Sequence, residues 1–167
     1  MKKRLIAILS ILMAFLVLLP SKAASAKNPT DEILDYVITI DVNDDASLNM
    51  YYHIEWKVLE DDIGALEWVK IGIPNDHYVS CTPASDNIKK IDMSGSYANI
   101  YFNKSYHKNE VVSFDFLLVQ EYMYEMNVLT EGESVFYFIP GWFEEFAVDH
   151  VEVRWNSDKV LSHSHAD

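Results

Sequence analysis

The sequence predicts an all-β protein, an antiparallel β-sandwich that is immunoglobulin-like in general form. Three observations carry this prediction. Segments in which apolar and polar residues alternate, the period of a half-buried strand, recur along the chain. Turn-forming residues separate these segments about every 8–12 residues, a spacing typical of sandwiches with about eight or nine strands. Beyond the N-terminal 26 residues, no segment sustains a helical period.

The clearest strand pair lies at 36–58. Before the turn, Ile38 and Ile40 alternate with polar or smaller residues, and turn formers follow at 43–46. After the turn, every second residue is apolar, so a strand would place these side chains on one face. We therefore expect a β-hairpin whose second strand buries a six-residue stripe: Leu48, Met50, Tyr52, Ile54, Trp56 and Val58.

The remaining strands follow in order and are separated by polar turns. Pro74 ends one of them, because proline has no backbone N–H to donate to a neighbouring strand. The segment 120–133 is either a strand extension or a long loop, and 140–146 is a turn or a single helical turn. Strands are expected at 66–73, 78–82, 86–93, 97–103, 111–119, 134–139 and 148–155.

The N-terminus has the order of a secretory signal peptide. Lys2, Lys3 and Arg4 precede an apolar run at 5–19, and small residues follow up to Ala26. The run is shorter than the roughly 20 residues that span a bilayer, which favours cleavage over a retained anchor. We expect a cleaved signal helix at 1–26, a β-sandwich domain at 27–156, and a polar tail at 157–167. The tail is either the true end of the protein or a truncated end.

Charge and cysteine content narrow the function classes. Cleavage would leave 9 basic and 26 acidic residues, a net charge of −17. Nucleic acids and anionic membrane surfaces attract clustered Lys and Arg, so neither is expected as a partner. Cys81 is the sole cysteine, which excludes an internal disulfide. We expect it to be a small, buried, apolar residue and not a reactive thiol.

Two segments match metal-binding motifs only in part. Asp41, Asn43 and Asp45 begin like a calcium loop, but Ala46 replaces its glycine and Tyr52 its bidentate glutamate. The acids of this turn are therefore expected to be solvated turn residues.

The second partial match is in the tail. His163, His165 and Asp167 resemble the H-x-H-x-D segment that ligates zinc in metallo-β-lactamase-type hydrolases. That fold also needs alternating helices and further ligands downstream, which this sequence does not supply. We expect no metal site and no cofactor.

No catalytic residue is assigned by the sequence. Carboxylates are numerous, but no spacing sets one apart as acid and another as base. Phosphate-binding loops, nucleophile elbows and H-E-x-x-H helices do not occur. The pattern favours a non-enzymatic protein.

The candidate ligand-binding residues are aromatic side chains in the two irregular segments: Tyr122, Tyr124, Trp142 and Phe143, with Phe146 close by. Aromatic rings on loops stack on sugar rings or anchor a protein partner. The more ordinary alternative is that they fold back and cover an open end of the sandwich. The sequence leaves both open.

Four segments together resemble a known group of proteins: ITIDVNDDASLNMYYHIEW (38–56), EWVKIGIPN (67–75), VFYFIPGWF (135–143) and VDHVEVRWN (148–156). With the signal peptide, they are similar to the extracellular N-terminal domain of uncharacterised envelope proteins, predicted membrane proteins found mainly in Gram-positive bacteria. Such proteins usually continue into a transmembrane segment. The resemblance implies a fold and a location, and no activity.

The sequence thus predicts a non-enzymatic module that is secreted or lies on the extracellular face of the cell envelope. It would act in binding a protein or a glycan there, or as the ectodomain of a longer envelope protein. The alternative is a carbohydrate-binding or carbohydrate-processing domain that uses the loop aromatics.

Overall fold

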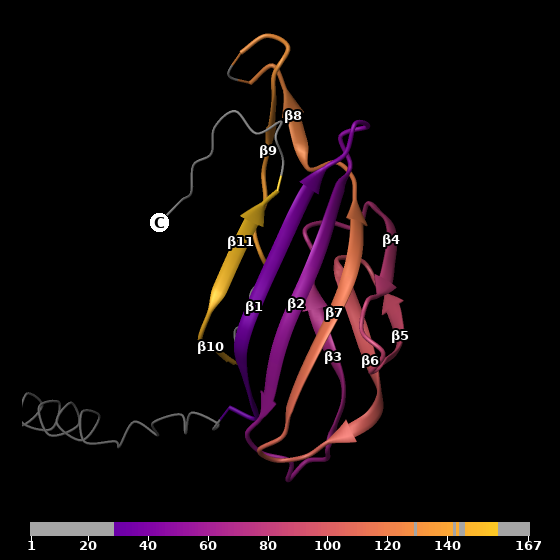
Figure 1. Ribbon diagram of the computed structural model, residues 1–167, viewed down its shortest axis with the longest axis vertical. Helices are drawn as coiled ribbons and strands as arrows, with labels where there is room; N and C mark the ends of the chain where they lie inside the picture. Colours follow the sequence, from indigo (N-terminus) through magenta and orange to yellow (C-terminus); the bar gives the residue numbers. More distant parts are fainter. Residues whose placement is uncertain (1–28, 129, 142, 144–145, 157–167) are drawn as a thin grey trace, which may run out of the picture.

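The computed structural model describes residues 29–128, 130–141, 143 and 146–156. Within these residues the chain forms two packed β-sheets and a small third sheet, which confirms the predicted all-β sandwich (Figure 1). The predicted signal peptide, Trp142 and the histidines of the tail lie outside the described residues. Among the described residues, no helix has the length and apolar character needed to cross a membrane.

The larger sheet contains six strands. Its order is β10–β1–β2–β7–β4, and β11 also lies beside β1. β1, β2, β7 and β4 pair antiparallel. The strands are β1 (Asp31–Val42), β2 (Leu48–Val58), β4 (Tyr78–Pro83), β7 (Val111–Gln120), β10 (Ala147–Val148) and β11 (Val151–Trp155).

The second sheet packs against the first and has the order β3–β6–β5, with antiparallel pairing throughout. Its strands are β3 (Leu66–Gly72), β5 (Ile88–Met93) and β6 (Tyr97–Tyr106). The third sheet is the hairpin of β8 (Tyr124–Met126) and β9 (Ser134–Phe136), which projects from one end of the sandwich (Figure 1).

The β1–β2 hairpin forms around the predicted turn, with Val42 opposite Leu48, but β1 begins at Asp31 and not at Tyr36. All six residues of the predicted stripe are 3% exposed or less, so the prediction of their burial is confirmed. The neighbouring β7 adds a matching stripe, because Trp56 pairs with Val112 and Tyr52 with Phe116. Strand alternation alone therefore builds this half of the core.

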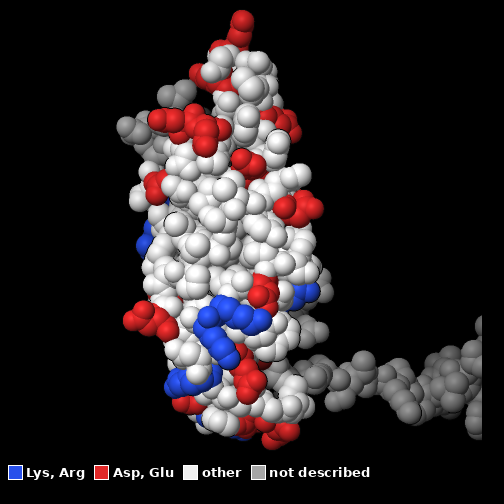
Figure 2. All heavy atoms as spheres, turned by 90° about the vertical axis from the view of Figure 1, so that its right-hand side faces the viewer, with Lys and Arg blue, Asp and Glu red and all other residues white. Residues whose placement is uncertain are grey.

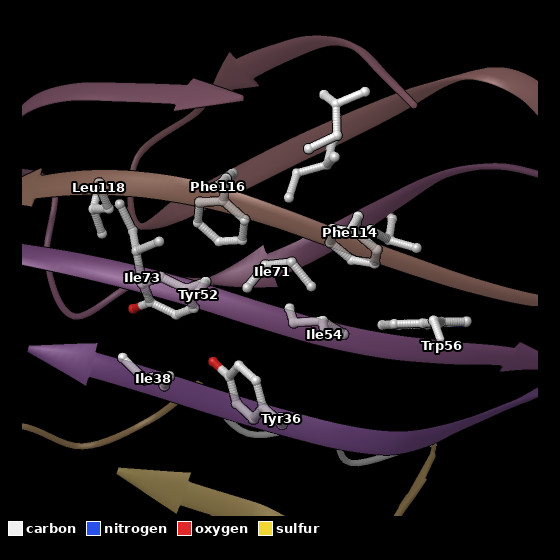
Figure 3. Packing of buried hydrophobic residues seen from close by; sticks show 14 of the residues in the cluster. Tyr36, Ile38, Tyr52, Ile54, Trp56, Ile71, Ile73, Phe114, Phe116 and Leu118 are labelled. Carbon is white, nitrogen blue, oxygen red and sulfur yellow. The ribbon is translucent and has the colours of Figure 1, made fainter. Parts of the chain in front are cut away.

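The core lies between the two layers. Figure 3 shows side chains of β1, β2 and β7 pointing toward Ile71 and Ile73 at the end of β3. Tyr52 stacks on Phe116 with ring centroids 4.5 Å apart, and the Phe102 ring meets Phe114 edge-on at 5.2 Å, which joins the two sheets. Aromatic pairs of this kind stabilise a core beyond the area that they bury.

The strands differ from the predicted ones in several places. β6 continues to Tyr106, where polar residues suggested a turn, because the Tyr106 ring packs edge-on against Phe102. β9 ends at Phe136 and not at Ile139, and eleven strands form in the described residues because several are very short. β11 runs parallel to β1, since the chain returns to the opposite end of the sandwich before β10 begins (Figure 1).

Candidate functional site

A hollow of about 320 Å³ lies at the end of the sandwich that carries the β8–β9 hairpin. Three segments far apart in the sequence form it: the residues after β3, the link from β7 into β8, and the residues after β9. We name it the tyrosine hollow. Its lining residues are Pro74, Asn75, Tyr122, Met123, Tyr124, Glu125, Tyr137 and Ile139.

Asn75 fixes one wall of the hollow to the end of β7. Its Nδ2 donates to the carbonyl oxygen of Glu121 (3.1 Å), and its Oδ1 accepts from the backbone N–H of His77 (2.7 Å). The fully buried Gln120 donates through Nε2 to the same Oδ1 and to the His77 carbonyl oxygen (2.7 Å). Buried polar groups that bond to each other in this way hold a wall in one geometry.

Tyr122 is held in the hollow by an unusual backbone. Its φ is +56°, in the left-handed region that residues other than glycine rarely adopt. Its side chain is nevertheless 71% exposed, and its ring meets that of His77 edge-on with centroids 4.7 Å apart. Residues held in such sparsely populated backbone regions cluster at functional sites.

The β8–β9 hairpin supplies the opposite wall. Tyr124 pairs with Phe136 across the hairpin, with ring centroids 5.6 Å apart, and the Phe136 ring lies 6.5 Å from that of Trp155. These contacts attach the hairpin to β11 of the large sheet.

The residues after β9 complete the hollow. The backbone N–H of Tyr137 donates to the carbonyl oxygen of the buried Met123 (3.0 Å). Tyr137 and Ile139 both remain exposed, Ile139 to 81%. The tyrosine hollow thus combines three phenol rings with an amide and a single carboxylate, Glu125.

The candidate residues from the sequence divide between the two expected roles. Tyr122 and Tyr124 line the hollow, whereas Phe143 packs edge-on against the rings of Tyr36 (5.5 Å) and Trp56 (5.8 Å). Phe143 therefore folds back and covers the core, which is the alternative role that the sequence leaves open for the loop aromatics. Trp142 lies outside the described residues.

Sequence reasoning missed several hollow residues. Tyr137 and Ile139 fall within the strand predicted at 134–139. The only sequence signal against a strand there is the nearby Pro140, because proline cannot donate a hydrogen bond to a neighbouring strand. Asn75 follows Pro74 at the end of a predicted strand, and the sequence assigns it no further role.

A second hollow of about 310 Å³ lies on the outer face of the large sheet. Its lining residues are Asp35, Val37, Thr39, Tyr51, His53, Asp115 and Arg154. His53 Nδ1 lies 2.7 Å from Asp115 Oδ1, and the Ser85 hydroxyl donates to the other oxygen of Asp115 (3.0 Å). Burial and the Asp115 carboxylate raise the pKa of Tyr51.

This second cluster does not have the arrangement of a nucleophilic site. A nucleophile must bond to the base that activates it, yet Ser85 and His53 both bond to Asp115 and not to each other. Arg154 is already held by Glu152, with its Nε 2.8 Å from Oε1. The His53–Asp115 bond ties β2 to β7 on the solvent face, whereas the Arg154–Glu152 pair lies within β11.

The β1–β2 turn uses its polar atoms internally. Asn43 donates to the Ser47 hydroxyl (2.9 Å), and that hydroxyl and the Ser47 N–H both donate to Asp45 Oδ1 (2.7 and 3.0 Å). These bonds lower the pKa of the Asp45 carboxyl. The described residues contain no group of three or more His, Cys, Asp or Glu side chains placed to hold a metal ion.

Cys81 packs against the core from β4. Burial raises the pKa of its thiol to about 12, so the nucleophilic thiolate is scarce at neutral pH.

Comparison with known proteins finds similarity only among solved structures. No family model matches the chain, and neither does any curated protein. The M1 zinc metallopeptidase from Deinococcus radiodurans is similar with a TM-score of 0.42 and 5% identity. A two-domain M1 zinc metallopeptidase variant bound to L-arginine gives a TM-score of 0.43 and 6% identity. Each match covers 55% of this chain and 20% of the peptidase chain, so the chain spans about a fifth of those enzymes.

Proposed function

We propose that this chain is an exported, non-enzymatic binding module of the bacterial cell surface, acting by itself or as the ectodomain of a longer envelope protein. Its binding site is the tyrosine hollow. The observation that carries the proposal is Tyr122, a large aromatic residue that is mostly exposed and has a left-handed backbone. A mostly exposed ring on a sparsely populated backbone conformation is suited to meet a partner.

The chemistry of the hollow supports binding over catalysis. Its lining side chains include one carboxylate, Glu125, and no His, Cys or Ser that would act beside it as base or nucleophile. Its walls are mainly apolar and aromatic, with Asn75 as the fixed polar group, which is the composition of a ligand pocket.

A saccharide is the second candidate, because the hollow also has the chemistry of a sugar site. Phenol rings stack on the apolar C–H face of a sugar, while an amide and a carboxylate bind its hydroxyl groups. Tyr122 and Tyr124, two of the aromatic residues that the sequence suggested for this role, lie in the same hollow as Asn75 and Glu125.

A pull-down with purified cell walls, followed by a glycan array, tests the proposal. We expect the exported chain to bind cell-wall material and Tyr122→Ala to lose most of that binding. Tyr51→Ala is the matched control, since Tyr51 is also an exposed tyrosine but lies on the outer face of the large sheet. Binding that survives Tyr122→Ala unchanged would exclude the hollow as the site. Glycan signals lost in the same variant would establish the saccharide.

A further inference from the structure

We propose that the tyrosine hollow binds a basic polypeptide segment through its Lys or Arg side chains. This inference rests on the proposed function and names the class of partner. It follows from three observations: the distribution of charge along the molecule, the lack of Lys or Arg partners for the described carboxylates of 121–133, and the Lys side chains that lie over three other tyrosines.

Lys and Arg are unevenly distributed along the long axis. The sequence from 109 to 153 contains ten acidic residues and no Lys or Arg. This stretch includes β7, β8 and β9 and supplies most of the hollow. On the face shown in Figure 2, Lys and Arg gather toward the end opposite the β8–β9 hairpin, whereas the charged residues at the hairpin end are Asp and Glu. The hollow therefore lies in a region of negative potential, which attracts cations.

Glu125 lines the hollow, and three further glutamates lie in the segment 121–133 that supplies part of its lining. Glu121, Glu125, Glu131 and Glu133 are all exposed. Among the described residues, none of the four forms a salt bridge with Lys, Arg or His. By contrast, Glu32, Glu60, Glu110 and Glu152, elsewhere on the molecule, each pair with a basic side chain.

Three tyrosines of the smaller sheet already have a lysine over the ring. On the smaller sheet, Lys70 Nζ lies 3.7 Å from the centre of the Tyr97 ring, and Lys90 Nζ lies 4.3 Å from that of Tyr101. Lys104 covers Tyr106 in the same way at 4.4 Å. Cations favour this position because the face of an aromatic ring is electronegative.

The tyrosines of the hollow have no such partner. Among the described residues, no Lys or Arg lies over the rings of Tyr122, Tyr124 or Tyr137. The three tyrosines and Glu125 of the same lining together form a site for an alkylammonium or guanidinium group. The exposed Ile139 and Met126 would contact the methylene stems of Lys or Arg, which bury against apolar surface while the charged group stays solvated. A neutral glycan would leave these carboxylates without a charged partner.

Fluorescence anisotropy with a short labelled peptide of alternating lysine and glycine tests this inference. The comparison peptide has the same sequence with every lysine acetylated, which removes the charge and keeps the length. We expect the exported chain to bind the lysine peptide, to bind it less tightly as salt is raised, and to ignore the acetylated one. Tyr122→Ala and Glu125→Gln should each weaken binding about fivefold. Tyr51→Ala and Glu67→Gln, on the outer faces of the two sheets, serve as controls and should change nothing.

The outcomes separate the two proposals. Equal binding of the lysine and acetyl-lysine peptides, or binding that neither hollow variant weakens, would overturn the basic-segment inference. If the lysine peptide does not bind while cell-wall binding still depends on Tyr122, the inference fails and the binding function stands. Failure of both assays would remove the function as well.

Discussion

At the scale of single residues, the aromatic candidates show where sequence reasoning stops. Tyr122 and Phe143 were grouped because both lie in irregular segments rich in glutamate. The structure places one in solvent and the other against Tyr36 and Trp56. A strand alternates its side chains between two faces, so the direction of each one can be predicted. A loop has no such period, and only its tertiary contacts decide which ring is buried.

This difference gives a prediction about stability. Phe143→Ala should lower the free energy of unfolding by about 1–3 kcal/mol, because it removes ring contacts at the edge of the core. Tyr122→Ala should change it by less than about 0.5 kcal/mol, since the Tyr122 ring is mostly solvated. Urea unfolding followed by tryptophan fluorescence measures both values. A larger loss in Tyr122→Ala than in Phe143→Ala would contradict the assigned roles.

Asp61 allows a second test, through pH. Hydrogen bonds from His107 Nδ1 (3.1 Å) and the Lys108 N–H (3.3 Å) lower the pKa of Asp61 below its ordinary 3.8. The folded chain therefore holds this proton less tightly than the unfolded chain, so the carboxylate stabilises the fold above pH 3.8 and loses that effect as pH falls through the lowered pKa.

We expect Asp61→Asn to be less stable than the wild type at pH 7 and the difference to shrink steadily on acidification below pH 4. Thermal melts across this range would measure the difference. A gap between the two proteins that is the same at pH 3 and pH 7 would show that the Asp61 carboxylate does not have this role.

At the scale of elements, the strands with strict alternation were predictable and the short ones were not. The stripe of β2 is buried residue by residue as its pattern indicates. β8, β9 and β10 span only two or three residues each, too few for a period to be read. The parallel direction of β11 depends on the path of the chain between β9 and β10, which no local pattern encodes.

The β2 stripe carries the sharpest prediction at this scale. Trp56→Asp should abolish cooperative folding, because it places a carboxylate where a 3% exposed side chain packs and leaves a cavity around it. Glu55→Asp, one residue away on the solvent face, should melt close to the wild type. Thermal melts of the two variants, followed by circular dichroism, test this prediction. A wild-type melting curve for Trp56→Asp would contradict the assignment of Trp56 to the core of the sandwich.

At the scale of the whole molecule, the candidate site cannot be predicted from the sequence alone. Two of its tyrosines were named, but the hollow itself depends on 74–75, 122–125 and 137–139 meeting at one end of the sandwich. Those contacts follow from the bond network of Asn75 and Gln120, and from the hairpin held by Phe136. Overall acidity is evident from composition, and the stretch 109–153 has no Lys or Arg, whereas the placement of basic residues away from the hairpin depends on the fold (Figure 2).

The most direct test of the account is an NMR titration of the isotope-labelled chain with soluble cell-wall fragments and with the lysine peptide. We predict that the backbone signals that move belong to the tyrosine hollow, above all Asn75, Tyr122, Tyr124 and Tyr137. Signals from the second hollow, at His53 and Asp115, should stay in place. Shifts centred on His53 and Asp115, or no shifts with either ligand, would contradict the assignment of the tyrosine hollow as the binding site.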